Sequence, residues 1–370
     1  MKLNPFLISG YVSPEYFCDR EHETARVLDV IANQRHLTVI SPRRMGKTGL
    51  IRHSFHNLKG SKKVRTVYID ILATTTLKEF TEAFGKAVLS VISGNESVVK
   101  KVLRQLSALR PKFSIDPLTG EPAITFQAKG GDQAEESLNT IFVYMAGMPF
   151  QYAIAIDEFQ QIADYPEKKT EALLRSYLQT TPNISFIFSG SRRHVLAEIF
   201  SLPARPFFNS TEMMEIGIID PAAYKSFIAE RFASGSKSVT DAALDYIEEL
   251  TGMHTFYVQY LCNRLYGSLK KAGTNEVKQL LSVILAENEP VYANYLTLLT
   301  PTQFRILKAI ALNNGVSEPT SSEFISEYQL GSPSTVSQAL KSLTEKQFVY
   351  HDGKKHKLTD VFFAWWMVYK

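Results

Sequence analysis

The sequence predicts an α/β fold in which a parallel sheet covered by helices is followed by a helical region and a winged-helix domain. Up to about residue 219, short apolar segments alternate with helical patterns, which is typical of a parallel sheet with helices on both faces. From Asp220-Pro221 onward the patterns are helical only. After residue 300, three short helical patterns precede two strand-like segments around Asp352-Gly353, a strong hairpin pair.

The composition is that of an ordinary globular protein. The chain has 370 residues, enough for two or three domains, with 45% hydrophobic and 21% charged residues. No apolar stretch is long enough to cross a bilayer, and the run at residues 6–8 is too short for a signal peptide, so we expect a cytoplasmic protein with no membrane partner. Cys18 and Cys262 are far apart, which argues against a zinc site or disulfide framework. With a net charge of only +4, any binding of polyanions depends on local basic clusters.

An aromatic-rich segment leads into the first helical pattern, which covers residues 21–31. Asp19 is placed to cap this helix. Tyr16 and Phe17 either pack beneath the first strand or help to form a pocket for an adenine base.

The segment Leu37–Thr48 carries the first chemical motif: an apolar strand, a tight turn and the start of a helix. It matches G-x-x-x-x-G-K-[ST], with Ser41 in place of the first glycine. Backbone N–H groups of such a loop surround the phosphates of a nucleotide. Lys47 would contact the β- and γ-phosphates, and the Thr48 hydroxyl would bind Mg²⁺. The residues expected to bind the nucleotide are Ser41, Pro42, Arg43, Arg44, Met45, Gly46, Lys47, Thr48, Gly49 and, later in the chain, Ser191.

The alternation continues with a strand expected over residues 64–71. Asp70, near its end, either has a local backbone partner or lies near the Mg²⁺ ion. Thr76 and Glu79 have the capping-box spacing of a helix start. A further helix is expected around residues 98–109. Alternating apolar residues around a Pro/Gly turn then predict an inserted hairpin at about 110–131.

The second chemical motif is an apolar strand, residues 152–156, that ends in two adjacent acids. Asp157 can hold Mg²⁺ through water, and Glu158 can polarise the water that attacks the γ-phosphate. A buried strand ending in Asp-Glu is weak evidence alone, but it is strong together with the phosphate loop.

The next buried strand, residues 184–189, ends in a polar tip. Ser189 or Ser191 can sense the γ-phosphate there, and Arg192 adds a charge that ATP and ADP would engage differently. The alternative is a basic helix start on the surface. Arg205, after the following helix, could meet the nucleotide of a neighbouring subunit, and residues 212–219 are expected to form the last strand.

The helical region contains four amphipathic patterns joined by short breaks. They cover residues 222–232, 241–250, 256–269 and 276–299. His254, in the connection between the second and third, either approaches a nucleotide or acts as a capping or packing residue.

The last 71 residues, 300–370, have the pattern of a winged helix-turn-helix. This domain either binds double-stranded DNA or serves as an internal packing or regulatory module. The aromatic C-terminal residues are too apolar for a loose tail and are expected to dock on the protein. Side chains suited to phosphate or base-edge contacts are Ser334, Thr335, Gln338 and Lys341 on the third helix and Lys354, Lys355, His356 and Lys357 on the wing.

Taken together, Arg43–Thr48, Asp157–Gln160, Gly190–Arg192, the helical region and the winged helix resemble the archaeal and bacterial P-loop ATPases of the STAND class. These are relatives of the AAA+ proteins and of the archaeal origin-recognition initiators. The resemblance implies a P-loop NTPase sheet of order 5-1-4-3-2, a helical lid, ATP or ADP with Mg²⁺ as ligands, and a nucleotide-driven switch between two arrangements.

Carried over to this chain, the resemblance makes Lys47, Asp157, Glu158 and Arg192 the catalytic residues, with Thr48 and Asp157 at the metal. The chain departs from the family at Ser41 and at Thr255, where many relatives have a lid proline near adenine. Longer relatives carry a nuclease-like domain after the winged helix, and we expect no nuclease activity here.

The predicted layout is an ATPase domain at residues 1–219, a lid at 220–299 and a winged helix at 300–370. The first functional hypothesis is an ATPase that hydrolyses ATP slowly and acts as a molecular switch. The alternative is a DNA-binding regulator whose conformation is set by nucleotide. A protein partner or assembly into a homo-oligomer is a further alternative.

Overall fold

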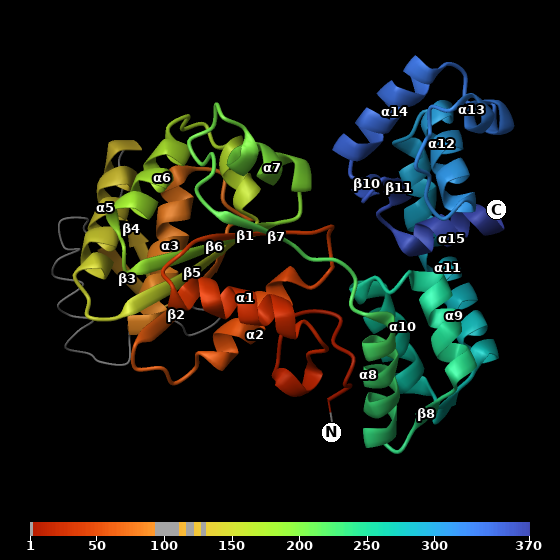
Figure 1. Ribbon diagram of the computed structural model, residues 1–370, viewed down its shortest axis with the longest axis horizontal. Helices are drawn as coiled ribbons and strands as arrows, with labels where there is room; N and C mark the ends of the chain where they lie inside the picture. The colour runs from red at the N-terminus through yellow and green to blue at the C-terminus, as the bar shows by residue number, and fades with distance from the viewer. Residues whose placement is uncertain (1–2, 93–110, 116–121, 127–130) are drawn as a thin grey trace. The chain divides into compact units, whose positions relative to one another are not determined.

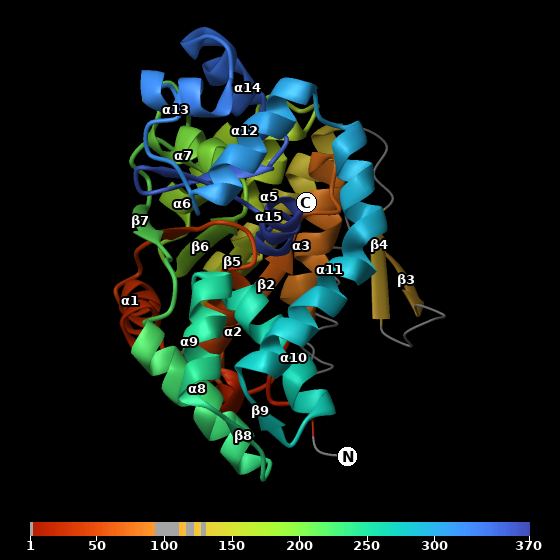
Figure 2. The ribbon, with the colours of Figure 1, turned by 90° about the vertical axis from the view of Figure 1, so that its right-hand side faces the viewer.

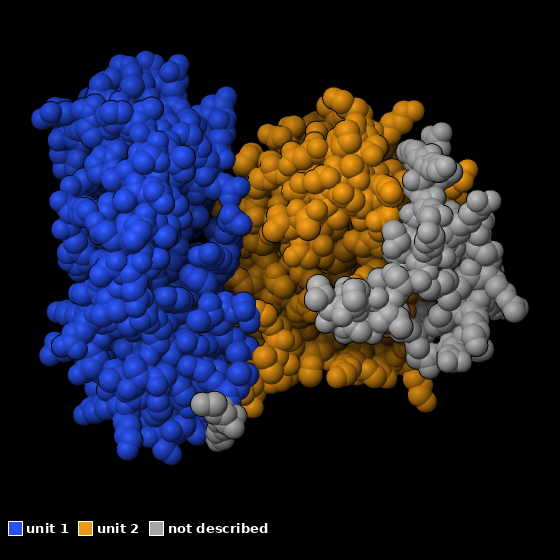
Figure 3. Space-filling model, turned by 180° about the vertical axis from the view of Figure 1, so that it is seen from behind, with its two compact units in different colours: residues 1–9, 42–44, 218–370 blue, residues 10–41, 45–217 orange. Residues whose placement is uncertain are grey.

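The computed structural model describes residues 3–92, 111–115, 122–126 and 131–370, and the helix expected around residues 98–109 lies outside them. Contacts divide the chain into two compact units (Figure 3). The unit that we call the sheet unit contains Gly10–Ser41 and Met45–Gly217. The unit that we call the helical unit contains Met1–Ser9, Pro42–Arg44 and Ile218–Lys370. Each unit is described below by itself.

The sheet unit is built on five parallel strands in the order β2-β5-β6-β1-β7 (Figure 1). Numbered along the chain as strands one to five, this is the order 5-1-4-3-2, so the predicted sheet is confirmed. The strands are β1 (Leu37–Ile40), β2 (Val64–Asp70), β5 (Gln151–Asp157), β6 (Ile184–Gly190) and β7 (Glu212–Glu215).

Helices cover both faces of this sheet. The helices are α1 (Glu21–Ala32), α2 (Lys47–Asn57), α3 (Leu77–Ile92), α5 (Gly131–Ala146), α6 (Thr170–Thr180) and α7 (Arg193–Ser201), with short 3-10 turns η1 (Pro14–Tyr16) and η3 (Phe159–Asp164). On β5, Ala153 and Ala155 share a core with α1 and α2, whereas Ile154 and Ile156 share a core with α3, α5, α6 and α7. Because β5 is buried on both faces, its side chains between Tyr152 and Ile156 are all apolar.

A hairpin is inserted between α3 and α5. Strands β3 (Pro111–Ile115) and β4 (Pro122–Phe126) pair antiparallel, within the range where the sequence predicted a hairpin.

At the start of α3, the Thr76 hydroxyl accepts a hydrogen bond from the Glu79 N–H, and the Glu79 carboxylate accepts one from the Thr75 N–H. Thr76 thus caps the start of α3, as its spacing predicted, while the Glu79 carboxylate bonds to the residue before the cap.

Two local predictions were wrong. Asp19 does not cap α1: the N-cap is Arg20, and both residues have positive φ, 55° and 70°, with no side-chain cap bond at Arg20. The last strand ends at Glu215 instead of residue 219, because β1 ends at Ile40 and offers β7 no further partner after the bond from Ile216 N–H to the Ile40 carbonyl.

The helical unit begins with four helices that lie together, and the winged-helix elements follow them (Figure 2). The first four are α8 (Pro221–Ser234), α9 (Asp241–Thr251), α10 (Thr255–Ser268) and α11 (Thr274–Thr297), with a short parallel pair formed by β8 (Ser238–Val239) and β9 (Lys271–Ala272). Side-chain caps at Asp220 and Thr240 fix the starts of α8 and α9.

The winged helix has the predicted order of three helices and a hairpin. Its elements are α12 (Pro301–Leu312), α13 (Ser322–Tyr328), α14 (Pro333–Glu345), β10 (Val349–Asp352), β11 (Lys355–Leu358) and a final helix, α15 (Val361–Tyr369). The expected docking of the C-terminus is confirmed, because Phe362, Phe363 and Trp366 are buried in α15. The indole N–H of Trp366 donates to the Glu289 carboxylate at 2.6 Å.

The first residues of the chain pack in this same unit. Phe6 is fully buried against the rings of Phe232 and Tyr266. The Asn4 amide donates to the Asn263 carbonyl at 2.9 Å, and the Asn263 amide donates to the Phe6 carbonyl at 2.7 Å. Within the described ranges, no helix is both long enough and apolar enough to cross a bilayer.

Candidate nucleotide-binding site

The loop between β1 and α2 has the backbone shape that a phosphate-binding turn requires. Gly46, the N-cap of α2, has a φ of 96°, a conformation that glycine adopts without steric cost. Arg44 also has a positive φ, 62°. The helix begins at Lys47, so the unbonded N–H groups of its first turn lie at the loop. Arg43 and Arg44 are exposed, whereas Met45 is buried.

Lys47 is held inside the loop. Its side chain is only 7% exposed, and its ammonium group donates to the Ser41 hydroxyl at 3.0 Å and to the Ser41 carbonyl at 3.3 Å. Ser41 replaces the glycine that begins the usual motif, and here its hydroxyl gives the ammonium a partner that glycine lacks. The buried charge is therefore satisfied within the loop.

Asp157 is the centre of a network at the carboxyl end of the sheet. It is 3% exposed, at the end of β5. Its Oδ2 accepts hydrogen bonds from the hydroxyls of Thr48 at 2.6 Å and Tyr68 at 2.7 Å, and its Oδ1 accepts one from Ser189 at 2.6 Å. These donors come from α2, β2 and β6, which meet here because the carboxyl ends of parallel strands share one edge.

Glu158 follows in a left-handed backbone conformation, with a φ of 56°. Its carboxylate accepts hydrogen bonds from the Ser191 hydroxyl at 2.9 Å, from the Ser191 N–H at 3.3 Å and from the Gln160 amide. Gln160 is buried against Gly190, where a Cβ atom would lie 1.8 Å from its Oε1. The glycine at the tip of β6 therefore makes room for the side chain that binds Glu158.

The residues present fit a Mg²⁺ ion that also binds phosphate. Thr48 and Asp157 place a hydroxyl and a carboxylate oxygen 2.6 Å apart, and both are hard oxygen ligands. Among the described residues, no group of three or more His, Cys, Asp or Glu side chains could hold a metal ion. A cation at this place would thus take its remaining ligands from phosphates and water, as Mg²⁺ does in nucleotide sites.

Comparison with protein families decides the class of this domain. Residues 17–194 match a family described as an ATPase domain predominantly from Archaea. They are an archaeal-type ATPase domain. Residues 290–369 match a family described as a probable winged helix domain. No curated protein matches the chain.

Solved structures show the same fold for this ATPase domain and its winged helix. A Walker-type ATPase of Pyrococcus abyssi matches with a TM-score of 0.67 at 17% identity, over 98% of this chain and 99% of that one. The ORC2 protein of Aeropyrum pernix, in complexes with ADPNP and ADP, matches with a TM-score of 0.57 at 14% identity over 99% and 96% of the chains. The ORC1 protein of the same organism, in complex with DNA, gives 0.51 at 13% over 96% and 93%.

The arginines that the sequence singled out form ion pairs within the sheet unit. Arg192 donates to the Asp164 carboxylate at 2.5 Å and to the Gln160 carbonyl at 3.4 Å. Arg205 pairs with Glu171, a largely buried carboxyl whose pKa is raised by burial and lowered in part by Arg205. The partner of Arg205 thus lies in the same sheet unit.

Two further candidates have local partners. Asp70 accepts a hydrogen bond from the Leu72 N–H at 2.9 Å, which is the local backbone partner that the sequence suggested as one alternative. It lies opposite Asp157 in the register of β2 and β5. In the helical unit, the buried ring of His254 packs against Tyr257.

Sequence reasoning missed Arg20, a residue that supports the loop of the ATPase domain. This guanidinium is almost fully buried and donates to the carbonyl of Met45 at 3.1 Å and to that of Gly217 at 2.8 Å, and it pairs with Glu23 at 3.1 Å. Its positive φ turns the chain before α1. A basic residue next to a predicted helix start gave no signal of these distant partners.

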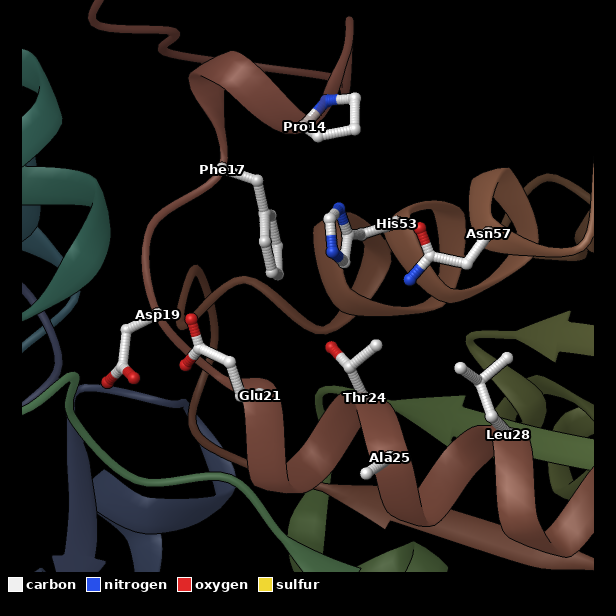
Figure 4. Close-up of a pocket in the computed structure, with 9 residues that line it drawn as sticks. All are labelled: Pro14, Phe17, Asp19, Glu21, Thr24, Ala25, Leu28, His53 and Asn57. Atoms are coloured by element: carbon white, nitrogen blue, oxygen red, sulfur yellow. The ribbon is translucent and has the colours of Figure 1, made fainter.

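A pocket opens beside helix α2 (Figure 4). Phe17, one of the residues considered for an adenine pocket, lines it and stacks on His53 with ring centroids 4.1 Å apart. The Phe17 ring also lies against Gly49, with 3.6 Å to the Cβ position of that residue. The residues that line the pocket are Pro14, Phe17, Asp19, Glu21, Thr24, Ala25, Leu28, His53 and Asn57.

The predicted contact residues of the winged helix differ in exposure and in pairing. Lys357 pairs with Asp352 at 2.7 Å, and His356 is half-buried, with its pKa lowered by burial and by the neighbouring His351. The remaining residues are exposed: Ser334, Thr335, Gln338, Lys341, Lys354 and Lys355. A surface of exposed hydroxyl, amide and ammonium groups on α14 and the wing fits phosphate and base edges.

Proposed function

We propose that the protein binds ATP with Mg²⁺ and hydrolyses it slowly, as a nucleotide-dependent molecular switch. The observation that carries this proposal is the contact between Thr48 and Asp157 at 2.6 Å, with Glu158 next in the chain. It supports a metal held between the phosphate loop and the acidic strand. The proposed domains are an ATPase domain at residues 1–219, a lid at 220–299 and a winged helix at 300–370.

In this proposal each residue has a separate role. Lys47 and the N–H groups of the loop bind the phosphates, and Mg²⁺ binds at Thr48 and Asp157 and neutralises charge on the phosphate oxygens. Glu158 polarises the attacking water, and Ser191 senses the γ-phosphate. The adenine is placed beside Phe17. The phosphate-contacting set is Ser41, Pro42, Arg43, Arg44, Met45, Gly46, Lys47, Thr48, Gly49 and Ser191, with Arg192 as an additional charge.

Slow hydrolysis is supported by the contacts of Glu158. Its carboxylate accepts hydrogen bonds from Gln160 and Ser191, so these donors compete with water for the general base. Turnover then depends on how often Ser191 moves from the glutamate to the phosphate. This is the coupling that a switch requires, because one residue contacts both the base and the nucleotide.

The test is the binding and steady-state turnover of ATP by the wild type and by Glu158→Gln. The variant keeps the shape and loses the base, so we expect ATP to bind with unchanged affinity and turnover to fall about a hundredfold. Equal turnover in the two proteins would remove Glu158 from the mechanism. Absence of nucleotide binding in the wild type would overturn the proposal itself.

A second candidate function, a nucleotide-regulated DNA-binding protein, is favoured by the exposed side chains of α14 and the wing. The measurement is ATP turnover with and without duplex DNA at low and physiological salt. Stimulation by DNA at low salt is expected if the two halves work together. Turnover that is unchanged by DNA, with no complex formed, would favour a protein partner or a second copy of the chain.

A further inference from the structure

Tyr68 is a residue of the nucleotide site to which neither sequence motif assigns a role. It lies on β2, two residues before Asp70 and opposite Ala155 of the acidic strand. Its hydroxyl donates to Oδ2 of Asp157 at 2.7 Å. From the sequence alone, Tyr68 would be expected to be a half-buried packing residue of the sheet. In the structure, however, its hydroxyl contacts the Asp157 carboxylate at the proposed metal site.

We propose that Tyr68 is a positioning residue for the divalent cation, whose hydroxyl keeps the Asp157 carboxylate turned toward the metal. The inference rests on the proposed function, because it names a further residue of the same site. Second-sphere donors of this kind orient a metal ligand without touching the metal.

The hydrogen bonds of Asp157 give Tyr68 this role. Thr48 and Tyr68 donate to Oδ2, while Ser189 and the N–H of Glu158 donate to Oδ1 at 2.6 and 3.0 Å. Thr48 is itself a proposed metal ligand, so its hydroxyl oxygen is shared with the cation. Tyr68 is then the donor on Oδ2 whose position does not depend on the metal.

The ring of Tyr68 is held in place for this contact. The guanidinium of Arg52 lies over it, 4.0 Å from the ring centroid.

Tyr152 on the neighbouring strand provides the contrast. This tyrosine is fully buried in the same sheet, and its hydroxyl has no hydrogen-bond partner among the described residues. Burial of a tyrosine in this sheet therefore does not by itself produce a contact such as that of Tyr68 with Asp157. Tyr152→Phe is the matched control, because it removes the same atom from the same sheet.

The experiment is a titration of a fluorescent ADP analogue onto purified wild type, Tyr68→Phe and Tyr152→Phe, first in EDTA and then at increasing Mg²⁺. We expect all three to bind the analogue equally in EDTA. The Mg²⁺ concentration for half-maximal enhancement of binding should rise about tenfold in Tyr68→Phe, within the range for lost second-sphere partners, and stay unchanged in Tyr152→Phe.

Two outcomes would overturn the inference and leave the proposed function standing. An unchanged Mg²⁺ midpoint in Tyr68→Phe would reduce Tyr68 to a packing residue. Weaker binding in EDTA by the same factor would assign its effect to the fold and not to the metal. If the wild type bound no nucleotide with or without Mg²⁺, the proposed function would fail first.

Discussion

The candidate nucleotide site and the winged-helix surface arrange their polar side chains in opposite ways. In the candidate nucleotide site, Lys47 and Asp157 are buried: Lys47 is bonded to Ser41 within its own loop, and Asp157 is bonded to Thr48 on another segment. On the winged helix, Gln338 and Lys354 are exposed. This difference fits the two proposed roles, because chemistry on a phosphate needs fixed geometry, whereas contact with a long polyanion needs only reach and charge. A single substitution should therefore have a large effect on ligand binding in the first region and a small effect in the second.

The largest effect is expected for Lys47→Ala, which removes a buried charge from the phosphate loop. Nucleotide affinity should fall about a hundredfold or more, because a charge-assisted contact to phosphate is lost. Titration calorimetry with ADP and Mg²⁺ measures it. Lys354→Ala is the control, since it removes the same group from an exposed position on the wing and should leave ADP affinity unchanged. Equal losses in both would erase the contrast between the regions.

Gly190→Ala tests the packing behind Glu158. The new Cβ would lie 1.8 Å from Gln160 Oε1 and 2.9 Å from Leu196 Cδ1, so we expect a loss of about 1–3 kcal/mol in the free energy of unfolding. ATP turnover should fall as well, because Gln160 binds the Glu158 carboxylate. Urea denaturation and turnover are measured together. The control Gly217→Ala has open space around its Cβ and should match the wild type.

Replacing Lys354 and Lys355 by Gln should weaken DNA binding and reduce its salt dependence, with each lysine making a small contribution. Each phosphate contact contributes about 0.9 to the slope of log affinity against log salt, so the double variant should lower that slope by about 2. Fluorescence anisotropy with a labelled duplex at several salt concentrations measures it. Lys62 and Lys63, exposed on a turn of the sheet unit, give a charge-matched control pair. The same change of slope in both pairs would mean that only net charge matters.

The smallest effect concerns pH and His36. Burial lowers the pKa of His36 below its ordinary value of 6.5, and its Nδ1 accepts a hydrogen bond from the Phe186 N–H at 3.2 Å. The unfolded chain therefore binds a proton on His36 more readily, so stability should fall as pH decreases below about 6.5. Urea midpoints at pH 7.5 and 5.5 measure this. In His36→Gln the fall should be smaller, and an identical fall would assign it to other groups.

The sequence predicted the sheet order, and it singled out Thr48 and Asp157, which lie in contact in the structure, because both results depend on short motifs. The strand–turn–helix at residues 37–48 and the apolar strand ending at Asp157 each contain their own chemistry. Their meeting follows from the rule that parallel strands share one functional edge. Comparison with known families and structures bears out the resulting ATPase fold.

The residues that the sequence did not identify make contacts with distant parts of the chain. Arg20 bonds to carbonyls at Met45 and Gly217, and Tyr68 bonds to Asp157, 89 residues later in the chain. Gln160 stands inside the acidic motif, yet its contact depends on the absence of a side chain at Gly190. Such partners are set by tertiary packing and have no local pattern. The mistaken cap at Asp19 has the same origin, because Arg20 fixes the turn through distant carbonyls.

The first residues of the chain have a practical consequence for dissecting the protein. Phe6 covers Phe232 and Tyr266, and the Asn4 amide donates a hydrogen bond to the Asn263 carbonyl. A fragment begun at residue 218 would leave these aromatic rings open to water and would be prone to aggregate. To express residues 218–370 separately, residues 3–9 should be supplied with them, for example as a co-expressed peptide.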